Sequence, residues 1–229
     1  MIPVNRYRDR VEAGQALARH LVESYRREHA IVLALPRGGV PVGHEIAQTM
    51  QIPLDVFVVR KIGLPQQTEV AMGAIATGDV QLFDDALIAE SKIPESMISS
   101  LVKRETQELT RRESLYRGDR PAPELANRPV ILVDDGVATG YTMRVAILAL
   151  QKLKPSHLTV AVPVGAPDTC ATIEGLVDEL ICPLRPSPFI AVGVWYDHFP
   201  PITDEDVRKR IMEAADAAKL HRENNASAS

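Results

Sequence analysis

Two adjacent acids, Asp134 and Asp135, directly follow the apolar run Val130–Val133 and precede the loop Gly136–Thr142. A short apolar run bounded by turn residues is typical of a strand that is buried on both faces of a parallel sheet. Ligands of open α/β sheets bind beyond the carboxyl ends of the strands, so we expect both acids to face a substrate. Carboxylates at such a place can accept hydrogen bonds from sugar hydroxyls or bind Mg²⁺.

The loop after the acids has the features of a phosphate site. Its backbone N–H groups precede a helix expected over about 142–153, and a helix N-terminus attracts anions through its free amides and its dipole. Thr139 and Thr142 add hydroxyls, and Gly140 allows a close approach or a positive φ. Two carboxylates would repel a phosphate unless they bind hydroxyls or Mg²⁺ of the same ligand, as a sugar phosphate with a free diol allows. The alternative is that the acids only cap the helix.

The whole string Val130–Thr142, VILVDDGVATGYT, resembles the phosphoribosyl diphosphate signature of the type I phosphoribosyltransferases. The resemblance implies that Asp134 and Asp135 act in catalysis by binding the ribose 2′- and 3′-hydroxyls, directly or through Mg²⁺-bound water. The implied substrate is 5-phosphoribosyl 1-diphosphate (PRPP), and the implied cofactor is Mg²⁺. The residues expected at its 5-phosphate are Val137, Ala138, Thr139, Gly140, Tyr141 and Thr142.

The loop departs from the family pattern at two positions. The hypoxanthine–guanine members carry a third acid where this chain has Ala138, and position 141 is usually small where this chain has Tyr141. The missing acid moves the chain away from the salvage of 6-oxopurines. The loop is more similar to the adenine and orotate type.

A second anion site is expected where the run Ala30–Leu35 ends at Pro36–Gly39. The two glycines expose backbone N–H groups, and the guanidinium of Arg37 offers a bidentate fork to phosphate oxygens. The next run, Leu54–Val59, ends at two basic residues placed to neutralise a diphosphate, although they are also compatible with an ordinary charged surface. The residues expected at the diphosphate are Arg37, Gly38, Gly39, Arg60 and Lys61.

An excursion separates the second and third apolar runs. Residues 63–85 alternate short apolar runs with turn residues and predict a β-hairpin, and a charged helix is expected over 94–116. Relatives carry a mobile lid here, so one of Arg111, Arg112 and Arg117 is a candidate to close over the diphosphate. A solvated helix face explains these charges equally well.

The acceptor is expected under a C-terminal hood in which aromatic residues gather over Phe189–Phe199. Phe189 or Trp195 is suited to stacking on a planar base, and Asp197 to accepting a hydrogen bond from an exocyclic amine. Alternatively, the cluster forms a dimer contact or packs a last strand, Ile190–Val194. The segment 161–168 has no lysine where purine enzymes of the family contact the base, so the sequence does not identify the nucleobase.

The alternation of strands and helices predicts an α/β fold with a doubly wound, mainly parallel sheet flanked by helices. We expect a single domain over residues 1–223, with the hairpin and helical excursion at 63–120, a hood at 183–203 and a disordered tail at 224–229. Expected strands are 30–35, 54–59, 130–133, 158–162, 179–182 and 190–194. Expected helices are 9–25, 39–50, 94–116, 142–153, 167–175 and 204–220.

Composition narrows the classes of function. A net charge of −4 argues against a general nucleic-acid binder. Cys170 and Cys182 are too far apart for a zinc-binding pair and are expected as buried thiols of a reducing compartment. No secretory signal and no apolar stretch of membrane-spanning length is visible, so we expect a cytoplasmic protein without a membrane partner.

The leading hypothesis is an enzyme that transfers phosphoribose from PRPP to a nucleobase or a related nitrogen acceptor and releases diphosphate. A second hypothesis is a regulator that keeps the PRPP site and senses nucleotide status without catalysis, because fold does not fix function. A third is transfer or hydrolysis on a phosphorylated sugar that is not attached to a base. Relatives are commonly dimers, so the resemblance implies a homodimer.

Overall fold

The computed structural model describes residues 6–24, 29–65 and 67–226 of the chain. Its centre is a parallel sheet of five strands, which confirms the predicted α/β class. Because β1 and β6 are neighbours, Ala34 is paired with Val133 and both strands end at the same edge. In spatial order the strands are β2 (Leu54–Val56), β1 (Ile31–Ala34), β6 (Pro129–Val133), β7 (His157–Ala161) and β8 (Glu179–Ile181).

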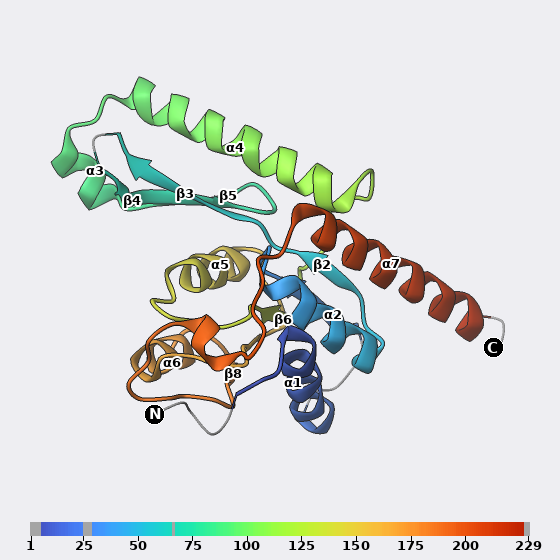
Figure 1. The fold of residues 1–229 in the computed structure, drawn as a ribbon. Coiled ribbons are helices and arrows are strands. Elements are labelled where there is room, and N and C mark those ends of the chain that lie inside the picture. The colour runs from blue at the N-terminus through green and yellow to red at the C-terminus, as the bar shows by residue number, and fades with distance from the viewer. Residues whose placement is uncertain (1–5, 25–28, 66, 227–229) are drawn as a thin grey trace.

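Helices cover both faces of this sheet (Figure 1). Side chains alternate along a strand, so Val32 and Ala34 of β1 enter one core whereas Ile31 and Leu33 enter the other. The first core is completed by α1 (Arg10–Ser24), α2 (Gly39–Met50) and α7 (Asp204–Ala226). The second is completed by α5 (Tyr141–Lys152) and α6 (Pro167–Glu174).

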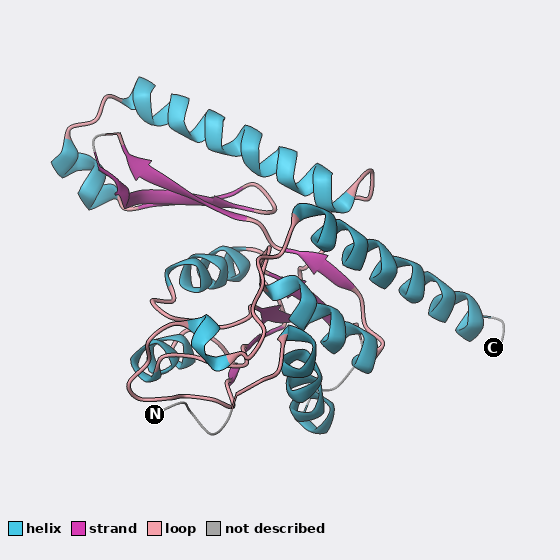
Figure 2. Ribbon diagram, viewed as in Figure 1, coloured by secondary structure: helices cyan, strands magenta, loops and turns pink. Residues whose placement is uncertain are grey.

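The excursion forms a second layer that projects from the main domain (Figure 2). It holds three antiparallel strands rather than a two-stranded hairpin, followed by two helices, α3 and α4. The predicted second strand, 54–59, is wrong at its end, because the chain leaves the central sheet after Val56 and Val59 already begins the excursion. Its elements are β3 (Val59–Leu64), β4 (Gln67–Ala76), β5 (Val80–Phe83), α3 (Asp85–Ser91) and α4 (Glu95–Arg117).

Two predictions about the C-terminal part are wrong. Residues 190–194 form no strand, and a 3₁₀ turn spans Val192–Trp195 because this segment packs on an aromatic cluster around Tyr196 instead of extending the sheet. Helix α7 continues through Ala226, past the predicted end at residue 220 and into the tail expected to be disordered. Its run of alanines and charged residues has high helix propensity, which explains the longer helix. Residues 227–229 lie outside the described part.

The two longest helices, α4 and α7, have 23 residues each and carry charged side chains along much of their length. Both pack against the domain through only part of their surface (Figure 1). Within the described residues, no helix combines the length and the apolar composition needed to cross a membrane.

A buried ion pair joins the end of α4 to the central sheet. The Nε of Arg117 donates to Asp55 of β2 at 3.0 Å, and the side chains of the two residues are 5% and 10% exposed. Asp55 also accepts a hydrogen bond from the backbone N–H of Val56. Since a buried charge without its partner is costly, this pair fixes the base of the excursion.

We therefore expect Arg117→Met to lower the free energy of unfolding by about 3–5 kcal/mol, because it leaves the carboxylate of Asp55 buried without its cation. Equilibrium unfolding in urea measures the change. Arg111→Ala is the matched control, because Arg111 lies on the exposed side of the same helix and its removal should leave the urea midpoint nearly unchanged. Equal effects of the two substitutions would show that Arg117 does not anchor α4.

Candidate functional site

The two loops predicted to bind anions meet at the carboxyl edge of the sheet. The backbone N–H of Leu35 donates to the carbonyl of Val133 at 2.8 Å, which continues the pairing of β1 with β6 past the end of β1. Beyond this point Gly38 lies directly against the carboxylate of Asp135, where any side chain at position 38 would collide with that carboxylate. The predicted closeness of the Arg37–Gly39 loop and the acid pair is therefore present in the structure.

Asp134 and Asp135 are largely buried, although each is an ionisable acid. Burial raises the pKa of Asp134 well above its usual range, and the neighbouring charge of Asp135 raises it further. Burial also raises the pKa of Asp135, against the opposing effect of Arg10. The backbone N–H of Asp135 donates to the Asp134 carboxylate at 2.9 Å. Two buried carboxylates at one loop favour a ligand that brings cations or hydroxyl donors to them.

Arg10 is a member of this site that the sequence did not reveal. Its Nε donates to the Asp135 carboxylate at 2.8 Å, and the two side chains are 8% and 14% exposed. The guanidinium also donates to the carbonyl of Pro200 at 2.8 Å and lies 3.6 Å from the ring centre of Phe199. Arg10 is 125 residues from Asp135 in sequence, and no motif or spacing marks it.

Tyr196 holds the other side of the acid loop. Its hydroxyl donates to the backbone carbonyl of Asp135 at 2.6 Å, and its ring packs between Tyr7 and Phe199. Burial strongly raises the pKa of Tyr196, so the hydroxyl remains a donor at neutral pH. The enrichment of aromatic residues in this segment drew attention to it, but the role expected there was acceptor binding by other side chains.

The predicted phosphate cradle forms the N-terminus of α5. Gly140 precedes the helix with φ of +68°, which residues with a side chain seldom adopt. Ala138, Thr139 and Thr142 are exposed, and none of the backbone N–H groups of residues 138–142 donates to a carbonyl outside the helix among the described residues. The Thr169 hydroxyl donates to the Ala138 carbonyl at 2.6 Å and fixes the loop.

Val137 does not belong to this cradle, so its predicted contact with the 5-phosphate is wrong. Its backbone N–H donates to the carbonyl of Val164 at 2.9 Å, and its carbonyl accepts from the N–H of Ala166 at 3.0 Å. Val137 therefore ties the acid loop to the segment after β7, and its side chain is buried. The amides that remain candidates for a phosphate begin one residue later than predicted, at Ala138.

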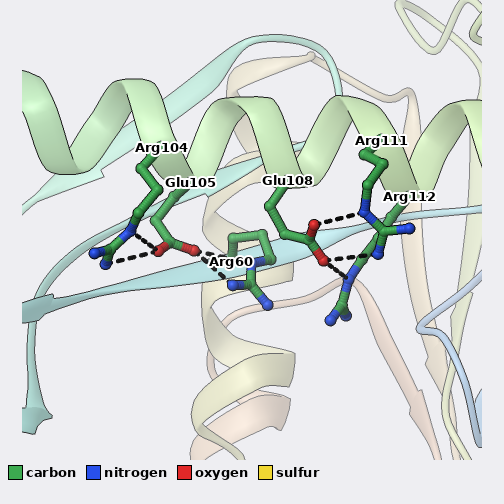
Figure 3. Close-up of polar contacts among 6 residues, drawn as sticks. All are labelled: Arg60, Arg104, Glu105, Glu108, Arg111 and Arg112. Carbon is green, nitrogen blue, oxygen red and sulfur yellow. Dashed lines mark hydrogen bonds and ion pairs between the residues drawn. The ribbon is translucent and has the colours of Figure 1, made fainter.

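The cations predicted for the diphosphate are divided between two places. Arg37 stands beside the acid loop, with its side chain 52% exposed and its Nη1 3.7 Å from Asp204. Arg60 and Lys61 were expected just after the second strand of the central sheet, but they lie inside β3 of the excursion. The guanidinium of Arg60 binds Glu105 of α4 at 2.6 Å (Figure 3). Contact of Arg60 and Lys61 with a diphosphate remains a prediction.

The excursion arginines have different environments. Arg111 and Arg112 share the carboxylate of Glu108 at 2.7 and 2.8 Å (Figure 3), and this pairing lowers the pKa of Glu108 to about 2. Arg117, the third candidate lid residue, is buried against Asp55 and is unsuited to a mobile role. Arg111 and Arg112 therefore remain the candidates of this group.

The residues predicted to bind the acceptor lie in the hood above the acid loop. Phe189 and Trp195 are partly buried against the cluster that contains Tyr196. Asp197 is 62% exposed, and its carboxylate lies 3.5 Å from the guanidinium of Arg6. Tyr196 connects this hood to the acids, so the hood is next to the site, but contact with an acceptor remains a prediction for all three residues.

The acid pair has the number of carboxylates that Mg²⁺ commonly takes from a protein. No group of three or more His, Cys, Asp or Glu side chains within the described residues is arranged to hold a metal. Mg²⁺ commonly binds through one or two carboxylates and takes its other ligands from water and substrate phosphates. Asp134 and Asp135, which are buried and have raised pKa values, are two such carboxylates and are suited to bind the ion directly or through water.

The two cysteines are buried, unbonded thiols, as predicted. Their sulfur atoms are 3.6 Å apart, and Cys170 belongs to α6, next to Thr169, whose hydroxyl donates to the Ala138 carbonyl in the loop before α5. They pack behind the site and contribute no zinc ligand set within the described residues.

Comparison with known proteins agrees with this geometry. Residues 4–198 match the model of the phosphoribosyl transferase domain family. Two proteins named putative phosphoribosyl transferase, from two strains of Mycobacterium tuberculosis, are each 37% identical over 199 residues, or 87% of this chain. The chain spans 45% of the length of these curated relatives. The crystal structure of TT1426 from Thermus thermophilus is 36% identical, with a TM-score of 0.80 over 91% of this chain and 98% of that chain.

The raised pKa of Asp134 predicts a stability that depends on pH. Its carboxyl ionises at about pH 4 when unfolded and at a higher pH when folded, so its ionisation costs stability as pH rises through the folded pKa. Without ligand, Asp134→Asn should therefore melt above wild type at pH 7.5, by about 2–4 °C per kcal/mol released. The difference should shrink towards pH 4. Differential scanning fluorimetry measures it, with exposed Asp119→Asn as control; an unchanged or lower melting temperature for Asp134→Asn would contradict the account.

The Arg10–Asp135 pair predicts a compensating double substitution. Arg10→Met leaves a buried carboxylate without its cation and should lower the free energy of unfolding by about 3–5 kcal/mol at neutral pH. Arg10→Met combined with Asp135→Asn removes that charge and should recover a large part of the loss. Urea unfolding of the two single variants and the double variant measures the coupling. Simple additivity of the effects of the two single substitutions would show that the pair is not an energetic unit.

Proposed function

The chain belongs to the phosphoribosyl transferase domain family, and we propose that it is an enzyme that transfers 5-phosphoribose from PRPP to a nitrogen acceptor and releases diphosphate. One observation carries the proposal. The acid pair lies between the loop at the N-terminus of α5 and the loop Arg37–Gly39, and all three are at one edge of the sheet. These three parts match the diol, the 5-phosphate and the diphosphate of PRPP.

The chain contributes mainly positioning and charge neutralisation to this reaction. The amides and hydroxyls of residues 138–142 hold the 5-phosphate at the N-terminus of α5. Asp134 and Asp135 accept hydrogen bonds from the ribose hydroxyls and would hold Mg²⁺, which would neutralise charge on the diphosphate. Arg37 and the amide of Gly38 bind the oxygens of the diphosphate as it leaves. The N–H of Gly39, which the sequence predicted to be exposed, donates instead to the carbonyl of Leu35 at 3.1 Å.

We propose a nucleobase as the acceptor, held under the hood. Phe189 and Trp195 have partly exposed aromatic surface next to the acid loop, which suits stacking on a planar ring. Asp197 is exposed and is a candidate to accept a hydrogen bond from an exocyclic amine. Ala138 replaces the third acid of the hypoxanthine–guanine members, so a 6-oxopurine is the least favoured base.

Removal of the acid pair tests the proposal. The double variant Asp134→Asn with Asp135→Asn should lower turnover by about 10²–10³-fold or more, since each acid aligns groups used in the transition state. The assay measures release of diphosphate from PRPP with Mg²⁺ and a panel of purine and pyrimidine bases. The folded fraction of the variant, followed by circular dichroism, should equal that of wild type.

Asp119→Asn, an exposed acid outside the site, is the control and should keep full turnover. Unchanged turnover in the double variant would refute the role of the acids. If PRPP raises the melting temperature of the wild type but no base supports turnover, the chain is a sensor of PRPP rather than an enzyme. Stabilisation by ribose 5-phosphate without release of diphosphate from PRPP would favour chemistry on another phosphorylated sugar.

A further inference from the structure

Asp204 is the first residue of α7 and lies next to Arg37 of the loop Pro36–Gly39. The helix does not need the Asp204 carboxylate as a cap. Thr203 and Asp206 form the capping contacts: the Asp206 N–H donates to the Thr203 hydroxyl at 3.1 Å, and the Thr203 N–H donates to the Asp206 carboxylate at 3.0 Å. This reciprocal arrangement satisfies the start of a helix. The carboxylate of Asp204 is therefore available for another purpose.

Two contacts define where that carboxylate lies. The hydroxyl of Tyr116 donates to Asp204 Oδ1 at 2.6 Å, and the same oxygen lies 3.7 Å from Nη1 of Arg37. Tyr116 is 1% exposed, and burial, followed by the hydrogen bond to Asp204, raises its pKa to about 12. The tyrosine therefore remains a fixed donor at neutral pH and sets the position of the carboxylate.

Tyr116 is held rigidly because it belongs to the base of the excursion. Tyr116 precedes Arg117, which is buried against Asp55 of the central sheet. The start of α7 and the end of α4 lie side by side in Figure 1, as the hydrogen bond between Tyr116 and Asp204 requires. Asp204 thus presents to Arg37 a carboxylate that is anchored through α4 to the sheet.

We propose that Asp204 is a positioning residue that holds the guanidinium of Arg37 towards the diphosphate of PRPP. The inference rests on the function proposed above and assigns to that site a residue outside the acid and phosphate loops. Arg37 is the only arginine of the loop between β1 and α2, and a free arginine side chain samples many rotamers. Restricting those rotamers before binding reduces the entropy lost when the diphosphate arrives.

The geometry leaves the guanidinium able to bind a second anion. Arginine has five N–H donors, and the 3.7 Å approach of Asp204 to one nitrogen leaves donors for phosphate oxygens. Asp204 follows Pro200, whose carbonyl accepts from Arg10, by four residues. The segment 200–204 therefore connects the cation that holds Asp135 with the anion that holds Arg37, so both sides of the substrate site are supported by one stretch of chain.

Binding of separate parts of the substrate tests this role. Isothermal titration calorimetry should follow inorganic diphosphate with Mg²⁺ and, separately, ribose 5-phosphate. Asp204→Asn should weaken diphosphate binding roughly threefold to fivefold, as expected for a half-exposed ion pair, and leave ribose 5-phosphate binding unchanged. Tyr116→Phe should change diphosphate binding in the same direction by a smaller factor, and Asp204→Glu should restore part of the affinity. In an Arg37→Ala background, Asp204→Asn should have no further effect.

Glu205→Gln is the matched control, because it removes the same charge from an exposed position in the same helical turn and should leave diphosphate binding unchanged. Equal or tighter diphosphate binding by Asp204→Asn would overturn the inference, as would an equal loss in the Arg37→Ala background. A wild type that binds neither diphosphate nor ribose 5-phosphate would overturn the proposed function itself, and the inference with it.

Discussion

The burial of two adjacent carboxylates at the end of β6 is the constraint on which the rest of this site depends. The pKa of Asp134 is raised because the protein compensates its negative charge poorly, whereas Arg10 partly compensates the charge of Asp135. A folded chain that keeps such charges is less stable than one with neutral side chains there. A ligand that brings Mg²⁺ and hydroxyl donors would remove that cost, so the same burial that destabilises the free protein would favour binding of such a ligand.

This constraint explains why both ends of the chain converge on one loop. Arg10, at the start of α1, supplies the cation for Asp135, and Tyr196, near the other end, donates to the backbone of the same residue. The segment after Tyr196 then accepts from Arg10 at Pro200 and continues to Asp204 beside Arg37. The hood, the first helix and the loop Pro36–Gly39 are thus one assembly joined by hydrogen bonds and an ion pair rather than separate attachments to the sheet.

The sequence predicted what depends on local pattern. Apolar runs predicted the central strands, and the resemblance of residues 130–142 placed the acids and the loop 138–142 at the carboxyl edge of the sheet, where the structure has them. Local patterns did not predict contacts between distant residues, since Arg10 and Asp135 are 125 residues apart and belong to no shared motif. Val137 was assigned to the phosphate because a motif does not show which amides the tertiary structure uses. The strand expected at 190–194 failed because packing on Tyr196 overrides its β-branched composition.

The distribution of cations shows how the fold separates stability from binding. Arg117 is buried on Asp55 and fixes α4, and Arg60 joins the excursion strands to the same helix through Glu105. Arg37 differs because its side chain is half exposed and its acidic partner lies 3.7 Å from its Nη1. A strong, buried pair would lock an arginine away from an incoming anion, and a fully free side chain would lose more entropy on binding. A half-exposed guanidinium held by one anchored carboxylate lies between these extremes, which suits the exchange of contacts with a diphosphate that we propose for Arg37.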